Sequence, residues 1–387
     1  MPVTVYYASI GPRLFTLDLD VERAALQERS SIALPANIQY AWPHPSRRYL
    51  YAVSSNGGPG IAGDAHFASA LAIDARTGAL NPVGASARLR SRPIHTSVDR
   101  GGSYLLTAYN NPSSVSVHRL NADGTIGDEV AQPDDLDTGI YAHQVLAAPS
   151  NGTVVLVTRG NDARADKPED PGALKIFSFR DGLLGNVASV APGNGLGFGP
   201  RHLDFHPTQP WVFVSIERQN KLYVYRLDDR TGIAREPLFI ADTLLERTHR
   251  VRQAAGPIHV HPNGRYVYLT NRTADTVEFA GRKVFAGGEN SVAVFAIDQQ
   301  SGEPTLLQNI DGDGIHLRTF GIDPGGSLLA AASIMPMPIR QGDRIGTMTA
   351  KRLLYRIGDD GRLDLARKYE IDTGAYQQFW SGLVTLA

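Results

Sequence analysis

Residues 206–215 read HPTQPWVFVS and residues 261–270 read HPNGRYVYLT, so in both stretches a polar turn precedes a short apolar strand. Residues 44–53 (HPSRRYLYAV) and 323–332 (DPGGSLLAAA) have the same form. Proline presets the backbone dihedral of such a turn and Gly or Asn relaxes it, so each turn is the corner of a β-hairpin. Strands and turns without long helical periodicity predict an all-β fold.

The turns recur at similar distances along the chain. With two weaker copies at residues 99–102 (DRGG) and 148–151 (APSN), six turns lie 49 to 62 residues apart, which is typical of four-stranded propeller blades. Three N-terminal strands, at residues 3–9, 13–20 and 25–33, and one C-terminal strand at 378–384 complete a seventh blade and close the ring. We therefore predict a single domain over residues 1–387, a seven-bladed β-propeller with four antiparallel strands per blade.

Composition excludes several classes of protein. The 387 residues include no cysteine, so disulfides, thiolate metal sites and cysteine nucleophiles are absent. Lys and Arg (38) nearly balance Asp and Glu (39), which predicts no strong binding to nucleic acid or to an anionic membrane. No stretch is apolar enough to span a bilayer, and no signal peptide is recognisable. We expect a soluble, cytoplasmic protein. The sequence leaves open whether it forms a homo-oligomer.

Functional residues are expected where the innermost strand of a blade begins, because the antiparallel neighbouring strand ends at the same rim. Six residues before each turn the chain has Gln39, Ile94, His143, Arg201, Gly256 and Arg318. Ten residues after it the chain has Ser55, Asn110, Arg159, Glu217, Arg272 and Ile334. A purely structural repeat would have similar small or apolar residues at these positions, so the unequal charged residues indicate a site.

A polar cluster follows from these positions. His143, Arg201, Glu217 and Arg272 belong to three consecutive blades, and a ring brings them together. The longest insertions, at residues 54–67, 159–172, 273–289 and 333–351, follow the second strand of their blades and are expected to wall a pocket at the same rim. An ion-pair network that holds the blades together is the alternative interpretation of the Glu and the two Arg.

Several motifs resemble one known family. Residues 199–207 (GPRHLDFHP), 214–217 (VSIE) and 270–274 (TNRTA) are similar to those of the seven-bladed propeller lactonases. Residues 108–110 (AYN) and 318–323 (RTFGID), with His95, extend the similarity over essentially the whole chain. That family includes a bacterial type of 6-phosphogluconolactonase and a fungal 3-carboxy-cis,cis-muconate lactonising enzyme.

The resemblance implies a role for individual residues. It implies that His143, Arg201, Glu217 and Arg272 are catalytic. The residues expected to contact the substrate are His95, Tyr109, Asn110, His202 and Arg318. The predicted substrate is a small lactone or sugar acid. No cofactor is expected, and the histidines show no metal-ligand spacing, so no metal is expected either.

Lactone hydrolysis suits this set of side chains. Arg201 and Arg272 are expected to stabilise an oxyanion or to bind a substrate carboxylate or phosphate. The resemblance favours Glu217 as the base that activates water, with His143 as its rival because its ordinary pKa lies close to working pH. The predicted function is hydrolysis of a small anionic or sugar-acid lactone. The alternatives are a cofactor-free cycloisomerase that forms a muconolactone-type ring and a non-enzymatic binding scaffold.

Overall fold

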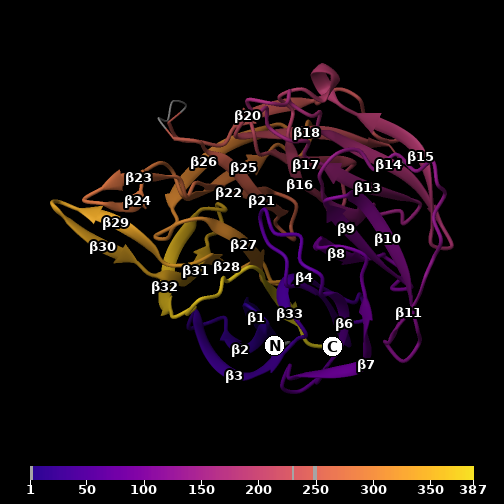
Figure 1. The fold of residues 1–387 in the computed structure, drawn as a ribbon, viewed down its shortest axis with the longest axis horizontal. Coiled ribbons are helices and arrows are strands. Elements are labelled where there is room, and N and C mark those ends of the chain that lie inside the picture. Colours follow the sequence, from indigo (N-terminus) through magenta and orange to yellow (C-terminus); the bar gives the residue numbers. More distant parts are fainter. Residues whose placement is uncertain (1–2, 229–230, 247–250) are drawn as a thin grey trace.

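The computed structural model describes residues 3–228, 231–246 and 251–387, which form seven antiparallel sheets arranged in a ring (Figure 1). Each sheet is four strands wide, and the innermost strands of successive blades contact one another around the full circle. The predicted seven-bladed all-β fold is therefore confirmed. No helix among the described residues is long and apolar enough to cross a membrane. That the ring is a single domain stays a prediction, which one cooperative unfolding transition would support.

Three blades come from the first half of the chain. Blade 1 consists of β4 (Asn37–Pro43), β5 (Tyr49–Ser55), β6 (His66–Ile73) and β7 (Leu80–Arg88). Blade 2 consists of β8 (Pro93–Val98), β9 (Tyr104–Asn110), β10 (Ser113–Leu120) and β11 (Ile126–Glu129). Blade 3 consists of β12 (Ala142–Ala147), β13 (Thr153–Thr158), β14 (Ala173–Arg180) and β15 (Leu183–Val190), followed by the short 3-10 turn η1 (Pro192–Gly195).

The next three blades carry additional strands. Blade 4 consists of β16 (Pro200–Phe205), β17 (Trp211–Ile216) and β18 (Lys221–Asp228), with β19 (Gly232–Ile233) and β20 (Phe239–Asp242) sharing its outer edge. Blade 5 consists of β21 (Ala254–Val260), β22 (Tyr266–Arg272), β25 (Ser291–Ile297) and β26 (Pro304–Asp311). Blade 6 consists of β27 (Leu317–Ile322), β28 (Leu328–Ser333), β31 (Ala350–Ile357) and β32 (Leu363–Ile371). Two hairpins are inserted after the second strands of blades 5 and 6, namely β23 (Thr276–Phe279) with β24 (Arg282–Phe285), and β29 (Met337–Gln341) with β30 (Arg344–Met348).

Blade 7 joins the two ends of the chain. It consists of β1 (Thr4–Ile10), β2 (Arg13–Asp20), β3 (Ala25–Ala33) and the C-terminal β33 (Ser381–Thr385). β33 pairs antiparallel with β1, from Thr4 opposite Thr385 to Ala8 opposite Ser381. This three-plus-one arrangement is the predicted closure, and it pairs the inner edge of the N-terminal sheet instead of leaving it free.

The hydrophobic core lies between the blades. The second strands, such as β9, β17 and β22, are buried almost throughout, because each sheet is covered on both faces by its neighbours. The outermost strands, such as β3 and β32, are largely exposed. Most apolar clusters combine residues of two adjacent blades; one of them joins Val155 and Leu174 of blade 3 to Val214 and Tyr225 of blade 4.

The histidines of the repeated turns link neighbouring blades. Nε2 of His206 donates to the carbonyl oxygen of Gly264 in the next blade at 2.9 Å, and its Nδ1 accepts from the backbone N–H of Gln209. His44 and His261 make the equivalent bonds to Gly102 and Gly326. Gly264 has φ +73°, and a Cβ there would lie 2.5 Å from the His206 ring. Glycine is required at this turn by both the dihedral and the close contact.

Candidate functional site

A cavity of about 770 Å³ opens at the rim where the innermost strands begin. The predicted insertions form part of its wall, through residues such as Pro59, Asp162, Thr276 and Met337. Hairpins β23–β24 and β29–β30 project from blades 5 and 6 on the left of Figure 1, and β24 contacts β29. A contact between Arg340 and the ring of Phe279, 4.5 Å from the centroid, joins the two hairpins. The insertions therefore build up one face of the ring, as the sequence predicted.

A repeated backbone irregularity directs residues toward this cavity. In six blades the pairing between the innermost strand and its neighbour shifts by one residue close to the start of the innermost strand. The unpaired positions are Gln39, Ile94, His143, Arg201, the Gly256–Pro257 pair and Arg318. A bulge leaves one residue outside the ladder and re-aims its side chain. The six-before-the-turn position of the repeat is thus a bulge in every complete blade.

The second set of predicted rim positions ends the neighbouring strands. Arg159, Glu217, Arg272 and Ile334 line the cavity, and Ser55 and Asn110 do not. Of the bulge residues, Ile94, His143 and Arg318 line it as well. The cavity is therefore built mainly from blades 2 to 6, because the inserted hairpins and the charged residues belong to that part of the ring.

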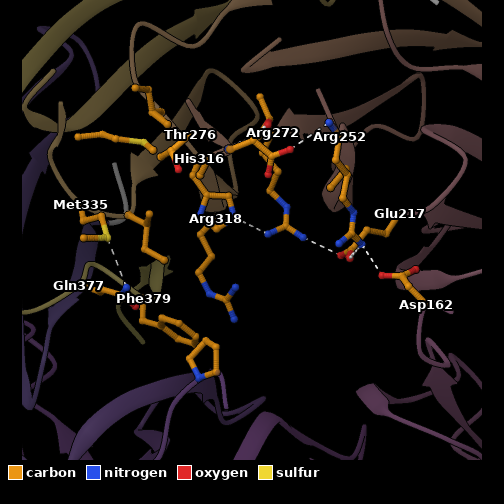
Figure 2. Close-up of a pocket in the computed structure, with 18 of the residues that line it drawn as sticks. Asp162, Glu217, Arg252, Arg272, Thr276, His316, Arg318, Met335, Gln377 and Phe379 are labelled. Atoms are coloured by element: carbon orange, nitrogen blue, oxygen red, sulfur yellow. Dashed lines mark hydrogen bonds and ion pairs between the residues drawn. The ribbon is translucent and has the colours of Figure 1, made fainter. Parts of the chain in front are cut away.

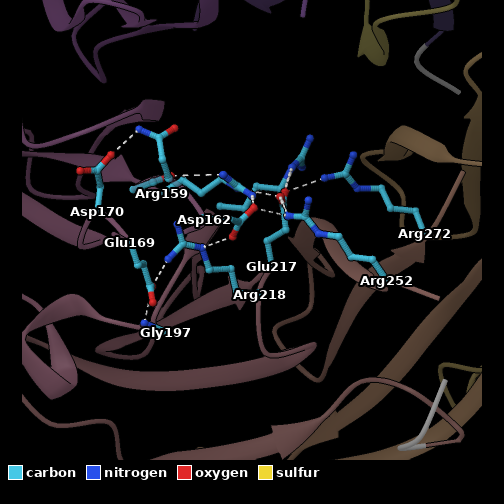
Figure 3. A network of polar contacts seen from close by, with 12 residues as sticks. Arg159, Asp162, Glu169, Asp170, Gly197, Glu217, Arg218, Arg252 and Arg272 are labelled. Atoms are coloured by element: carbon cyan, nitrogen blue, oxygen red, sulfur yellow. Dashed lines mark hydrogen bonds and ion pairs between the residues drawn. The ribbon is translucent and has the colours of Figure 1, made fainter. Parts of the chain in front are cut away.

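Glu217 is surrounded by arginines (Figure 3). Its Oε1 accepts from Nε of Arg159 at 2.7 Å, and its Oε2 accepts from Nη2 of Arg272 at 2.7 Å. Nε of Arg201 forms an ion pair with the same Oε2 at 3.0 Å. Three guanidinium groups from blades 3, 4 and 5 thus share one carboxylate, and the structure brings together three of the four residues predicted as catalytic.

Burial and charge have opposite effects on the pKa of Glu217. Burial alone would raise the pKa, but Arg272, Arg159 and Arg201 together lower it from 4.5 to about 2. An opposite charge at hydrogen-bond distance favours the ionised form, so Glu217 is a carboxylate at any working pH. A carboxylate with so low a pKa is a weak base, which bears on its predicted role.

A second carboxylate organises the mouth of the cavity. Oδ2 of Asp162 is 2.9 Å from Nη2 of Arg159 and 2.9 Å from Nη2 of Arg252. Oδ1 of Asp162 is 2.8 Å from Nε of Arg218, which also forms an ion pair with Glu169. Figure 3 shows this chain of charges running from Glu169 to Arg272. The network fixes the orientation of Arg159 and Arg252 before any ligand arrives.

Two histidines that line the cavity are neutral. Burial, together with Arg201, Arg318, Arg272 and Arg159, lowers the pKa of His143 well below 6.5. Burial and nearby arginines likewise lower the pKa of His316. Nη1 of Arg272 donates to Nε2 of His316 at 2.6 Å, so the proton of His316 is on Nδ1. Nδ1 of His143 is buried with no partner in the described structure.

The predicted contacts His95 and His202 lie outside the cavity lining. The His202 ring contacts the rings of His143 and His95, with centroids 5.1 Å and 5.9 Å apart. The His95 ring lies 4.1 Å from that of Tyr40, and burial with Arg201 lowers its pKa to about 3. These side chains form a cluster of aromatic rings next to His143, in which both contacts of the His202 ring are edge-to-face.

The four remaining predicted residues have different surroundings. Tyr109 is buried between blades 1 and 2, and its hydroxyl is 2.7 Å from Oγ of Ser116. Neither Tyr109 nor Asn110 lines the cavity. Arg201 is only 1% exposed and is also absent from the lining, so it contacts Glu217 from beneath. Arg318 lines the cavity with its guanidinium carbon 3.6 Å from the centroid of the Phe379 ring.

Several cavity residues were not predicted. Arg159 occupies the same repeat position as Glu217 and Arg272, so the repeat comparison already contained the signal for it. His316 and Arg92 each lie two residues before a bulge, a position that the sequence comparison did not consider. Asp162 lies in the predicted insertion 159–172, although the residue itself was not singled out. Phe379 lies in the predicted strand 378–384, but the observed strand begins only at Ser381, which leaves Phe379 in a connecting segment. Arg252 belongs to a connecting segment that no sequence signal marks. Within the described ranges, no group of three or more His, Asp or Glu side chains is placed to hold a metal ion.

Comparisons with known proteins agree with this fold. The chain is 26% identical over 329 residues to a 6-phosphogluconolactonase of Bacillus subtilis, covering 83% of this chain and 84% of that protein. It is 30% identical over 295 residues to the enzyme of the same name from Pectobacterium carotovorum, covering 75% and 79%. The structure of a periplasmic gluconolactonase from Pseudomonas aeruginosa superimposes with a TM-score of 0.76 at 19% identity over 100% of both chains, which shows a shared fold.

A family model also matches most of the chain. The sequence model of a family described as "Lactonase, 7-bladed beta-propeller" matches residues 2–334, which include all six bulged strands and the Glu217 cluster. The chain therefore belongs to the seven-bladed β-propeller lactonase family.

Proposed function

We propose that this protein hydrolyses lactones of sugar acids that carry an additional negative charge, as in 6-phosphogluconolactone. The observation that supports this most is the charge of the cavity. Seven cationic side chains line it, against three acidic ones. The cationic residues are Arg92, Arg159, Arg164, Arg252, Arg272, Lys283 and Arg318. Such a surplus concentrates anionic ligands, and the relatives named above are lactonases.

His143 is the preferred base in this proposal. The family resemblance favoured Glu217, but Arg159, Arg272 and Arg201 already occupy both of its carboxylate oxygens, so the carboxylate is not free to take a proton from water. His143 lines the cavity and is neutral, so one ring nitrogen has a free lone pair. Glu217 instead holds Arg159 and Arg272 in place, and Arg201 acts beneath it as a positioning residue.

The proposed reaction adds one water molecule to the lactone. His143 removes a proton from that water as its oxygen attacks the carbonyl carbon, and Arg272 stabilises the oxyanion that forms. The bond from the carbonyl carbon to the ring oxygen then breaks, and protonated His143 returns the proton to that oxygen. Burial and the nearby arginines disfavour imidazolium, which favours this return of the proton. The product is an open-chain hydroxy acid, and its carboxyl group loses its own proton to solvent.

A lactone panel tests the proposal. The initial rate of acid release, measured with a pH indicator near pH 6.5, is compared with spontaneous opening for phosphorylated and neutral sugar lactones. We expect saturable hydrolysis, a loss of about a hundredfold or more in His143→Asn and Arg272→Met, and little change in His259→Asn. His259 is a matched control because it lies on an innermost strand outside the cavity lining. Rates equal to the spontaneous rate for every lactone would refute the proposal.

The ring-forming alternative is not proposed, because no observation in the cavity favours it over hydrolysis. A cytoplasmic location stays a prediction, which cell fractionation would test, and light scattering would determine the oligomeric state, which the sequence left open.

A further inference from the structure

Among the described residues, three arginines of the cavity have no acidic partner: Arg164, which is exposed, and Arg92 and Arg318, which are more deeply placed. No carboxylate within residues 3–228, 231–246 and 251–387 lies at ion-pair distance from Arg92 or Arg318, in contrast to Arg159 and Arg272. Nε and Nη2 of Arg92 donate to the single neutral oxygen Oε1 of Gln39, at 3.0 and 2.8 Å. Arg318 donates no hydrogen bond to any described residue, although it lines the cavity. These two cations are therefore uncompensated.

Both guanidinium groups lie over the same aromatic ring. The guanidinium carbon of Arg318 is 3.6 Å from the centroid of the Phe379 ring, and that of Arg92 is 5.9 Å from it. The chain next to Phe379 is held firmly, because the backbone N–H of Gln378 donates to the carbonyl of Ile334 at 2.7 Å. Phe379 itself belongs to the C-terminal segment, beyond residues 2–334, which match the family model.

The pair lies apart from the Glu217 cluster. Figure 2 shows Arg318 and Phe379 on one side of Arg272, with Glu217 and Asp162 on the other. Arg92, Arg318 and Phe379 all line the cavity, so a bound molecule in the cavity can reach them. The cavity thus has a carboxylate-balanced end and an end with unbalanced positive charge.

Uncompensated charge in a partly dehydrated cavity is unfavourable for the empty protein. Arg92 is only 8% exposed, and burial, with Arg272 and Arg92, lowers the pKa of Arg318 to about 9. Like charges repel, and a buried cation without an acceptor loses hydration energy. Planar guanidinium groups bind carboxylates and phosphates through paired hydrogen bonds, so an anionic ligand would remove both penalties.

We propose that Arg92, Arg318 and Phe379 form a subsite for an acidic group of the substrate remote from the lactone carbonyl. This inference rests on the proposed function and deepens it. A lactone has converted its own carboxyl group into an uncharged ester, so the acidic group must be another substituent. It is a phosphate ester or a second carboxylate, and the subsite selects lactones that carry one over neutral lactones of the same ring.

The test compares three substrates on three variants. The substrates are 6-phosphogluconolactone, a sugar lactone with a free carboxylate, and uncharged glucono-1,5-lactone. The variants are Arg92→Met, Arg318→Met and the control Arg352→Met. Arg352 is a matched control because it is also buried, donates from Nε to Oε1 of Gln378 at 2.8 Å and lies 5.6 Å from the Phe15 ring, outside the cavity lining.

We expect Arg318→Met and Arg92→Met to reduce kcat/KM for a charged lactone by about tenfold to a hundredfold each, mainly through KM. In both variants, kcat/KM for the neutral lactone should change less than about threefold. The control Arg352→Met should leave kcat/KM unchanged for charged and neutral lactones. Loss for the phosphate substrate alone identifies a phosphate subsite, and loss for the carboxylate substrate alone identifies a carboxylate subsite. Equal losses for charged and neutral lactones would overturn the inference.

Calorimetric binding of 6-phosphogluconate and of gluconate to the whole protein separates this inference from the proposed function. If wild-type protein opens no lactone but binds 6-phosphogluconate more tightly than the Arg318→Met variant does, the subsite stands and the hydrolase proposal fails. If wild-type protein opens lactones and neither variant changes the preference for charge, the subsite fails and the hydrolase proposal stands. A wild-type protein that neither opens a lactone nor binds 6-phosphogluconate contradicts both.

Discussion

Replacement of Glu217 by glutamine removes one negative charge and nearly preserves the side-chain shape. Oε1 loses its ionic contact with Nε of Arg159 at 2.7 Å, and Oε2 loses those with Arg272 at 2.7 Å and Arg201 at 3.0 Å. A neutral amide cannot compensate three guanidinium groups, and its NH₂ group is a donor facing donors. We therefore expect Glu217→Gln to lower the stability of the fold as well as its activity.

The pKa of Glu217 sets the size of the effect on stability. In the folded protein, the surrounding arginines lower this pKa from 4.5 to about 2 despite burial. Each pKa unit corresponds to about 1.4 kcal/mol. The ionised form is thus favoured in the folded state by about 3 kcal/mol, similar to the loss when one partner of a buried ion pair is removed. We expect Glu217→Gln to reduce the free energy of unfolding by about 3 kcal/mol at pH 7.

The sign of the pH dependence makes the prediction specific. A lowered carboxyl pKa contributes stability above the unfolded-state pKa of about 4.5, and this contribution is lost as the pH falls from there toward 2. Urea unfolding followed by tryptophan fluorescence at pH 7, 5 and 4 measures the gap between wild type and variant, with exposed Glu278→Gln as control. The gap should begin to narrow at pH 4. Equal stability at pH 7, or a gap that widens on acidification, would refute the reasoning.

Further predictions concern the two histidines of the cavity and the turn at Gly264. His143→Asn should lower kcat by about a hundredfold to ten-thousandfold, and added imidazole should restore part of the rate, which it would not do for a merely structural histidine. Gly264→Ala should destabilise the fold by about 1–3 kcal/mol in thermal unfolding, through its positive φ and the contact with His206; Gly281→Ala, with similar φ but open space, should cost less, and equal costs would contradict the role of the contact. Because burial lowers the pKa of His143 and His316, the unfolded chain binds more protons below pH 6.5, so stability should fall with acidification from 6.5; unchanged stability from pH 7 to pH 5.5 would contradict it.

The repeat made the fold predictable in detail. The turn chemistry and its spacing predicted the blades, and the three N-terminal strands with one C-terminal strand predicted the closure that β1 and β33 form. The hairpins β23–β24 and β29–β30 were predicted only as insertions, because residues 273–289 and 333–351 carry no signal of the repeat. A comparison of repeats predicts the positions that recur in every blade, but it gives no information on segments that occur only once.

The candidate site was only partly predictable for the same reason. Glu217, Arg272 and His143 occupy recurring positions that end a strand or form a bulge, so a comparison of blades found them. That comparison cannot tell which residue reaches the cavity and which is covered, and Arg201 is covered. The pairing of Arg92 and Arg318 over Phe379 joins blades 2 and 6 to the C-terminal segment, which only the three-dimensional arrangement shows.

A crystal structure with bound 6-phosphogluconate would test most directly whether side chains from different blades form one anion-binding cavity. We predict that the carboxylate formed by ring opening lies beside Arg272 and His143, and that the phosphate lies between Arg92 and Arg318. Ligand density outside the cavity, or a phosphate bound at the Glu217 end, would contradict the account.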